Sequence, residues 1–156
     1  MTNKVFQIVD SAGATYNGND LTTSVATIEP GLLVKKDAGA STVSLAGSSG
    51  SAPYGVAFGA RDLPYAPTTR LYDTGEALVV VSGHGIGLWS ADFFSSGSVP
   101  TDQAANQDIY AGSNGLLALT GTYKIGRLID IKTVKDASGG TGTSNNLARI
   151  EFNFVP

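Results

Sequence analysis

Apolar residues recur at every second position, or in short unbroken runs, through most of this chain. The central run is residues 78–81 (Leu-Val-Val-Val), which is mostly β-branched and lies in a stretch bounded by glycines. A run of this length is too short for an ordinary helix and indicates a strand that is covered on both faces. Gly83, Gly85 and Gly87 follow at alternate positions, before apolar character resumes at residues 88–89. This stretch predicts a strand, a bent glycine corner and a second strand, as at the corner of a small barrel.

The same alternation predicts about eight strands in all. Besides the central stretch they fall in the segments 5–9, 32–36, 43–45, 54–59, 109–119, 123–134 and 147–155. Two turn signals lie between them: Pro30-Gly31 fits a type II turn, and Asn114-Gly115 fits the type I′ turn of a hairpin. The spacing of short strands and turns predicts an all-β fold, a single small barrel or sandwich-like domain with long loops.

The first twenty residues have a different pattern. Val5, Phe6, Ile8 and Val9 form a short apolar, β-prone piece, and residues 11–20 are dominated by Gly, Asn, Ser and Ala. A short apolar segment on a flexible tether is typical of an arm that lies outside the compact core. The alternative is that this piece is the first strand of the domain, followed by its loop. The arm interpretation divides the chain into an N-terminal arm at 1–20 and a β-domain at 21–156.

Composition supports one β-rich domain and excludes some classes of partner. The 156 residues include 20 glycines and only 15% charged residues, with a net charge of −3 and a pI of about 4.9. The cations are scattered, with Lys35-Lys36 as the only adjacent pair, so we expect no nucleic-acid binding. Cysteine is absent, and no apolar segment has the length of a membrane span or of a signal-peptide core. We therefore expect that the protein is made in a cytoplasm and does not associate with a membrane.

One tripeptide resembles a catalytic motif. Asp73-Thr74-Gly75 matches the turn that carries the catalytic aspartate of aspartic proteases, and Gly126-Arg127 resembles a later element of the same family. Glu76 departs from the family pattern, which has a small residue beside the shared proton. Since turn-forming residues are common in this chain, the simpler interpretation is that Asp73 shapes a turn.

Two further candidates have equally simple interpretations. His84 is the only histidine, and it is either an exposed loop residue or a single metal ligand. Without cysteine or a second histidine, a zinc site is not expected, and no cofactor is expected either. The aromatic residues could line a sugar-binding platform, although core and interface packing is their usual role in a β-protein. These aromatics are Tyr54, Tyr65, Tyr72, Trp89, Tyr110 and Tyr123.

Six segments, read together, resemble a known family in their order and spacing. They are Glu29–Val34, Gly55–Ala57, Gly75–Gly83, Asp108–Gly112, Ile125–Arg127 and Ala148–Phe152. Their succession over residues 28–155 is similar to that of the head decoration proteins of tailed phages, also called capsid cement proteins. Each segment alone contains only turn and strand chemistry.

The resemblance implies a non-enzymatic β-barrel protein that forms homotrimers. Such trimers bind the major capsid protein on the outer surface of the phage head and stabilise the expanded shell. In some members of the family an N-terminal arm adds a strand to the capsid protein, which would make Val5, Phe6, Ile8 and Val9 the capsid-binding residues here. Two alternatives stay open: a carbohydrate- or receptor-binding β-module of a virion surface, and an aspartic protease that uses Asp73.

Overall fold

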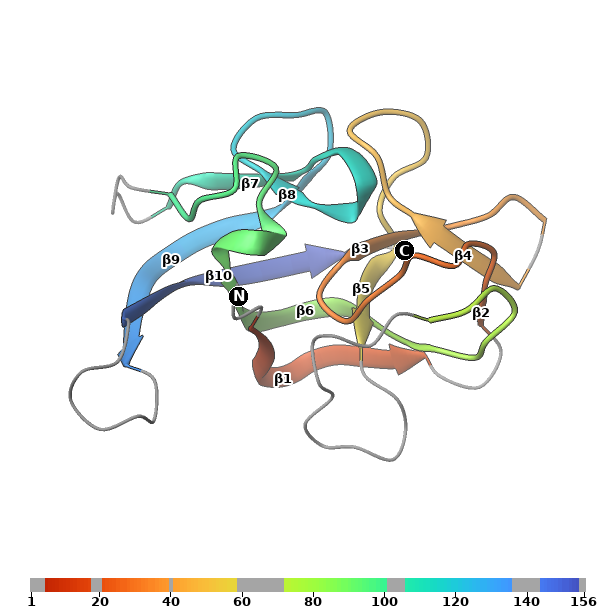
Figure 1. The fold of residues 1–156 in the computed structure, drawn as a ribbon, viewed down its shortest axis with the longest axis horizontal. Coiled ribbons are helices and arrows are strands. Elements are labelled where there is room, and N and C mark those ends of the chain that lie inside the picture. Colours follow the sequence, from red (N-terminus) through yellow and green to blue (C-terminus); the bar gives the residue numbers. More distant parts are fainter. Residues whose placement is uncertain are drawn as a thin grey trace.

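The computed structural model describes residues 5–17, 21–39, 41–58, 72–100, 106–135 and 144–154 (Figure 1). Their regular structure is almost entirely extended, so the predicted all-β fold is confirmed. The strands are β1 (Phe6–Asn17), β2 (Thr22–Thr23), β3 (Leu33–Lys36), β4 (Thr42–Leu45), β5 (Gly55–Phe58), β6 (Val79–Ser90), β7 (Asp108–Ala111), β8 (Leu117–Ala118), β9 (Lys124–Lys135) and β10 (Ser144–Phe154). Two single-turn 3₁₀ helices, η1 (Ala91–Phe93) and η2 (Ser113–Gly115), complete the described elements.

All ten strands belong to one mixed sheet. Its order is β2-β4-β3-β5-β6-β10-β9-β7-β8, and β1 joins it by pairing with β6. The pairs are antiparallel except β2 with β4, which is parallel. Within the described residues the path has two separate ends, β2 and β8, so the sheet is not closed into a barrel. The sandwich-like part of the prediction is the one that the structure supports, because strands from both halves of the sheet, including β3 and β8, contribute side chains to one main core.

Strand β6 lies at the centre of this sheet, and on one of its two edges the neighbouring strand changes partway along. One edge of β6 pairs with β1 from Val80 to Trp89. The other edge pairs with β5 as far as Val81, and with β10 from Gly83 onward. Gly83 has a φ of +78°, and a Cβ there would lie 2.6 Å from the carbonyl oxygen of Gly13, so the position requires glycine. The predicted corner between two strands is therefore one continuous strand that exchanges β5 for β10.

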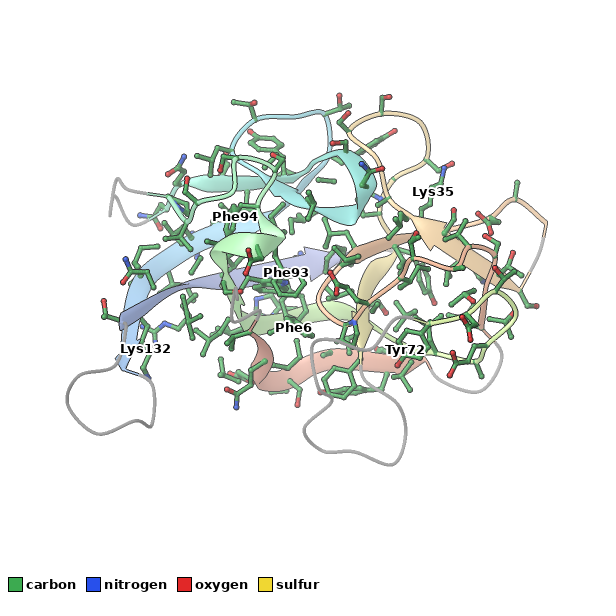
Figure 2. The ribbon with its side chains drawn as sticks, in the orientation of Figure 1. Phe6, Lys35, Tyr72, Phe93, Phe94 and Lys132 are labelled. Atoms are coloured by element: carbon green, nitrogen blue, oxygen red, sulfur yellow. The ribbon has the colours of Figure 1, made fainter. Side chains whose placement is uncertain are left out.

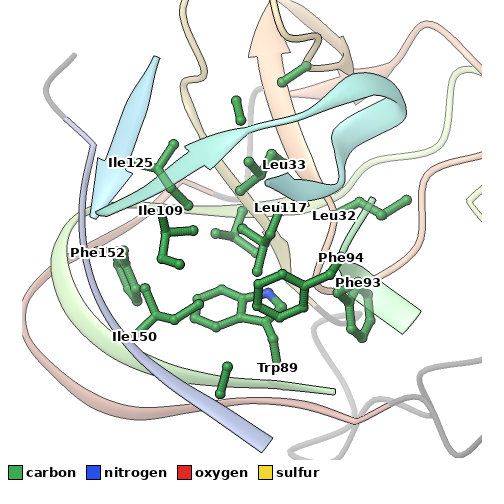
Figure 3. Close-up of a cluster of buried hydrophobic side chains, with 14 of the residues drawn as sticks. Leu32, Leu33, Trp89, Phe93, Phe94, Ile109, Leu117, Ile125, Ile150 and Phe152 are labelled. Carbon is green, nitrogen blue, oxygen red and sulfur yellow. The ribbon is translucent and has the colours of Figure 1, made fainter. Parts of the chain in front are cut away.

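Large side chains from both halves of the sheet form a main core between them (Figure 3). Its centre is Trp89, which is fully buried and donates its indole N–H to the carbonyl of Gly31 over 3.0 Å. This bond ties β6 to the turn that precedes β3. A smaller second core lies around Tyr72, which is fully buried and donates its hydroxyl to the carbonyl of Phe58 over 2.8 Å.

Both turn predictions are confirmed. Gly31 has a φ of +99°, and the N–H of Leu32 donates to the carbonyl of Glu29 over 3.2 Å, as a type II turn requires. Asn114 and Gly115 have φ values of +55° and +74°, and they connect β7 to β8 in a hairpin. The loop of this hairpin is longer than a two-residue turn, because it includes η2.

The N-terminal segment is a strand of the sheet and not a separate arm. Phe6–Asn17 forms β1 along the whole of one edge of β6, so the boundary predicted between residues 20 and 21 does not separate an arm from the domain. The reason is that the apolar side chains at the start of the segment find partners on the central strand, far away in sequence. Residues 11–17, which were expected to form an irregular tether, continue the same strand.

Candidate interaction edge at strand β1

Two hydrogen bonds with Ser90 anchor the start of β1. The N–H of Val5 donates to Ser90 Oγ, and the N–H of Ser90 donates to the carbonyl of Val5, each over 2.9 Å. From there the register runs from Phe6 opposite Trp89 to residue 17 opposite Val80. Val5 is therefore fixed at the end of β6 in the isolated chain.

The next two predicted site residues point into the protein's own core. Phe6 is half-buried, and its ring centroid lies 5.1 Å from that of Trp89 and 6.4 Å from that of Phe93 (Figure 2). Ile8 pairs with Gly87 on the same face and also packs against the main core. Since these side chains already have partners, only part of each is available to another protein.

Val9 lies at an irregularity that turns its side chain outward. The register of β1 against β6 shifts between Ile8 and Asp10, and again between Asp10 and Gly13. Bulges of this kind re-aim side chains and increase the local twist. Asp10 Oδ1 accepts the N–H of Ala12 over 3.0 Å and so fixes the second irregularity. Val9 is left 47% exposed, which makes it the most accessible of the four predicted residues.

The outer edge of β1 is the candidate interaction site. Among the described residues β1 pairs only with β6, so its second edge presents backbone N–H and C=O groups without a strand opposite. Edge strands are commonly protected by lysine, proline, bulges or short length. Phe6–Asn17 has twelve residues and no lysine or proline, and its one charge, Asp10, lies between its two register irregularities. Val9 and Tyr16, the large apolar side chains that are exposed in the described part of the chain, both lie on this strand.

Tyr16 is a member of this edge that sequence reasoning missed. It lies opposite Val81, is 47% exposed, and its ring packs edge-on against Phe58 at 5.5 Å. The Gly-, Asn- and Ser-rich composition around Tyr16 predicts a tether, but the structure shows a strand there. The available signal is the alternation of Ala14 and Tyr16, which continues the inward face of Phe6 and Ile8 beyond the bulges.

A small charged cluster lies on the outward face of the sheet beside this edge. His84 Nε2 lies 3.1 Å from Glu151 Oε1, and Arg127 Nη2 donates to Glu151 Oε2 over 3.5 Å. The hydrogen bond with His84, aided by Arg127 against a smaller effect of burial, holds the pKa of Glu151 below its usual 4.5. His84 is exposed, as predicted, but it lies in a strand and not in a loop. In the described ranges no three His, Asp or Glu side chains are grouped to hold a metal ion.

Asp73 lies in a turn that is held together by hydrogen bonds to its backbone. Its N–H donates to Glu76 Oε2 over 3.0 Å, and its carbonyl accepts both the N–H of Glu76 and the hydroxyl of Thr23. The side chain of Asp73 is exposed. Glu76, the residue that departs from the protease pattern, therefore closes the turn around Asp73.

The aromatic residues of the possible sugar platform are dispersed and largely covered. Trp89 and Tyr72 are fully buried, in different cores. Tyr54, Tyr110 and Tyr123 are half-buried, and Tyr65 lies outside the described residues. An exposed row of rings for stacking on sugars is therefore not found in the part of the chain that the structure describes.

No family model and no curated protein matches the chain. In the described residues no helix has the length and apolar character needed to cross a membrane. The assignment of a role to the β1 edge therefore depends on its geometry and on the sequence resemblance.

Proposed function

We propose that this protein is a decoration protein of a tailed-phage head. It would be made in the host cytoplasm, bind the major capsid protein on the outer surface of the head as a homotrimer, and stabilise the expanded shell. The observation that carries the proposal is the edge of β1, a long strand that has no second strand opposite it among the described residues and bears two exposed apolar side chains. The ordered succession of segments from Glu29 to Phe152 supports it.

The mechanism that this edge favours is addition of a strand from the shell. A capsid strand placed along β1 would satisfy the free N–H and C=O groups of both partners. Because Val5 and Phe6 already anchor β1 to β6, the protein would pay little conformational entropy on attachment. Val9 and Tyr16 would then bury apolar surface against the shell. The attachment strand is thus part of the rigid domain, whereas the sequence interpretation has it as a flexible arm.

The decisive experiment measures occupancy of undecorated, expanded heads. Val9→Lys and Tyr16→Lys place a charge at the exposed positions of the β1 edge, and we expect each to lower head affinity by about tenfold or more, since burying an unpaired lysine costs over ~1.4 kcal/mol. Thr74→Lys is the matched control, because Thr74 is exposed and belongs to the Asp73 turn, outside β1. Occupancy by both edge variants equal to that of wild type would contradict this mechanism.

The trimer is tested on the particle itself. Three chains of 16.0 kDa give about 48 kDa, and a cryo-EM map of decorated heads should show density of this size at threefold and quasi-threefold positions. A map with isolated monomers or twofold dimers would contradict the proposed assembly.

A further inference from the structure

Two extra residues interrupt β1 in its middle. The twelve residues of Phe6–Asn17 lie opposite only the ten residues of Val80–Trp89 in β6, so β1 contains two residues more than its partner. One extra residue lies between Ile8 and Asp10, and the other lies between Asp10 and Gly13. Each of them forms a β-bulge, which bends its strand and disrupts the ladder of backbone hydrogen bonds.

The two bulges together keep the apolar side of β1 directed to the core. One extra residue turns every later side chain to the other face of a sheet, and a second one restores the first direction. Phe6 and Ala14, on either side of the bulges, accordingly both pack against the main core. Asp10, between the bulges, lies opposite Ile86 and is exposed. The pair of bulges therefore keeps the one charge of β1 out of the core.

Glycines of β6 provide the space for this interruption. The carbonyl oxygen of Asp10 lies 2.7 Å from the position that a Cβ would take at Gly85, and the carbonyl oxygen of Gly13 lies 2.6 Å from the corresponding position at Gly83. A Cβ so close to a backbone atom would force the two strands apart. The alternate glycines of β6 thus let the bulged part of β1 approach closely, which is one of the uses of glycine in a strand.

The bulges leave two regular parts of β1 that differ in length. Gly13–Asn17 pairs residue by residue with Val80–His84, whereas the part before the bulges is only Phe6–Ile8. β1 lies at the lower edge of the sheet in Figure 1, and among the described residues no strand lies beyond it. A typical strand has about five or six residues, so it fits beside the second part and not beside the first.

We infer that the two bulges confine strand addition at β1 to Gly13–Asn17, and so prevent this edge from pairing along its whole length with the β1 of a second copy. The inference rests on the proposed function, in which a strand of the shell occupies this edge, and it names the part of the edge that the shell strand uses. A long unbroken edge without lysine or proline is a template for any extended chain. Val9, exposed at the first bulge, stays available for a side-chain contact with the shell.

Deletion of Val9 and Ser11 tests the role of the bulges in the free protein. It removes one residue from each bulge and no charge. Every residue of β1 that now pairs with β6 keeps its partner, and Ala12 comes opposite Gly85, which the present register skips. We expect the variant to fold, and to associate further than wild type at concentrations at least ~10-fold lower, because its edge is unbroken. Adding Thr15→Lys to the deletion should reverse this association, since lysine protects an edge.

Asp10→Asn is the matched control, because it separates the bulges from the charge between them. Asparagine keeps an oxygen that can accept the N–H of Ala12 but carries no charge. The length of β1 is unchanged, so we expect the mass of this variant to equal that of wild type. Sedimentation velocity from micromolar to millimolar concentration gives the masses, and far-UV circular dichroism and urea denaturation confirm folding.

Two results with the free proteins would overturn the inference. A folded deletion variant with the mass of wild type would show that the bulges do not prevent self-pairing. Association of Asp10→Asn would show that the charge protects the edge, and this result does not depend on whether the deletion variant folds.

Amide hydrogen exchange locates the added strand on the particle itself. Mass spectrometry of wild-type protein, free and bound to expanded heads, should show exchange that slows strongly at residues 13–17 and little at residues 9–12. Equal slowing of the two ranges would also overturn the inference, because the shell strand would then pair across the bulges. The proposed function fails separately, when wild-type protein does not bind expanded heads, and the deletion and Asp10→Asn still test the bulges in that case.

Discussion

The ring of Phe6 packs on the indole of Trp89, with centroids 5.1 Å apart and ring planes at 42°. This contact joins the start of the described chain to the centre of the main core. It determines the character of the N-terminal segment, because an aromatic ring in such a contact is part of the folded domain.

Phe6→Ala should therefore destabilise the protein. Loss of a half-buried phenylalanine from an aromatic cluster should lower the free energy of unfolding by about 1–3 kcal/mol, less than for a fully buried ring. Val9→Ala, at an exposed position of the same strand, should change it by less than about 0.5 kcal/mol. Urea denaturation measures both. An unchanged midpoint for Phe6→Ala would indicate that the segment is detached in solution, as the arm interpretation requires.

Gly83→Ala tests the point where β6 exchanges β5 for β10. The new methyl group would need a positive φ and would lie 2.6 Å from the carbonyl oxygen of Gly13, so we expect a loss of more than about 2 kcal/mol in unfolding free energy. Gly75→Ala separates the two causes, because Gly75 also has a positive φ, +84°, but has open space around it. Its loss should be about 1 kcal/mol. Equal losses for the two variants would show that the close approach to the Gly13 carbonyl of β1 adds nothing to the loss of unfolding free energy.

Asp37 makes the stability of the β3–β4 hairpin depend on pH. Burial alone would raise the pKa of Asp37, but hydrogen bonds from Ser44, Ser24 and Thr42 outweigh it and hold the pKa below the usual 3.8. The hydroxyl of Thr42 donates to Asp37 Oδ2 over 2.8 Å, and the hydroxyl of Ser44 donates to Asp37 Oδ1 over 2.7 Å. A lowered folded pKa stabilises the fold above pH 3.8, and this contribution is lost as the pH falls through the folded value.

Asp37→Asn should therefore be less stable than wild type at neutral pH. The difference in unfolding free energy should stay constant between pH 5 and 7, and then shrink below about pH 4 as the wild-type carboxylate is protonated. Ser44→Ala removes one donor and should weaken the same pH dependence. Urea midpoints measured at a series of pH values test this, and a wild-type-to-variant difference that is independent of pH would refute it.

Asp73→Asn tests the alternative of an aspartic protease. Since the described hydrogen bonds of this residue come from its backbone, the change should alter unfolding free energy by less than about 0.5 kcal/mol. Glu76→Ala should cost more, about 0.5–1.5 kcal/mol, because it removes the acceptor of the Asp73 N–H. Peptidase activity that is present in wild type and lost in Asp73→Asn would reverse our interpretation of the turn.

Local patterns predict most of the strands and turns of this fold, and they fail where a partner is distant in the chain. The alternation of Ile150, Phe152 and Phe154 and the Asn114-Gly115 turn define their elements through neighbouring residues alone. The role of Gly83 depends on which strands border β6, and no local pattern contains that information. Strand spacing predicts a barrel or a sandwich-like domain without distinguishing them, and the described sheet is not closed.

At the candidate site, too, local sequence predicts the strand but not its distant partners. The apolar character of Val5, Phe6, Ile8 and Val9 identifies a β-prone segment, and the structure makes it a strand. Which of its side chains face the core follows from the pairing with β6 and from the bulges around Asp10, so the exposure of Val9 and Tyr16 is visible only in three dimensions.

The neighbours of β6 also govern the order in which this fold can be completed. Its partners along most of its length are β1 and β10, the first and the last of the described strands. During synthesis on a ribosome, β1 must wait for β6, and the pair then keeps its second edge partly uncovered until β10 has emerged. Non-local pairing of this kind is typical of proteins that fold slowly, on the order of milliseconds to seconds, and a partly synthesised chain keeps strand edges open to aggregation. The yield of folded protein should therefore depend on conditions during synthesis, such as temperature and chaperone supply.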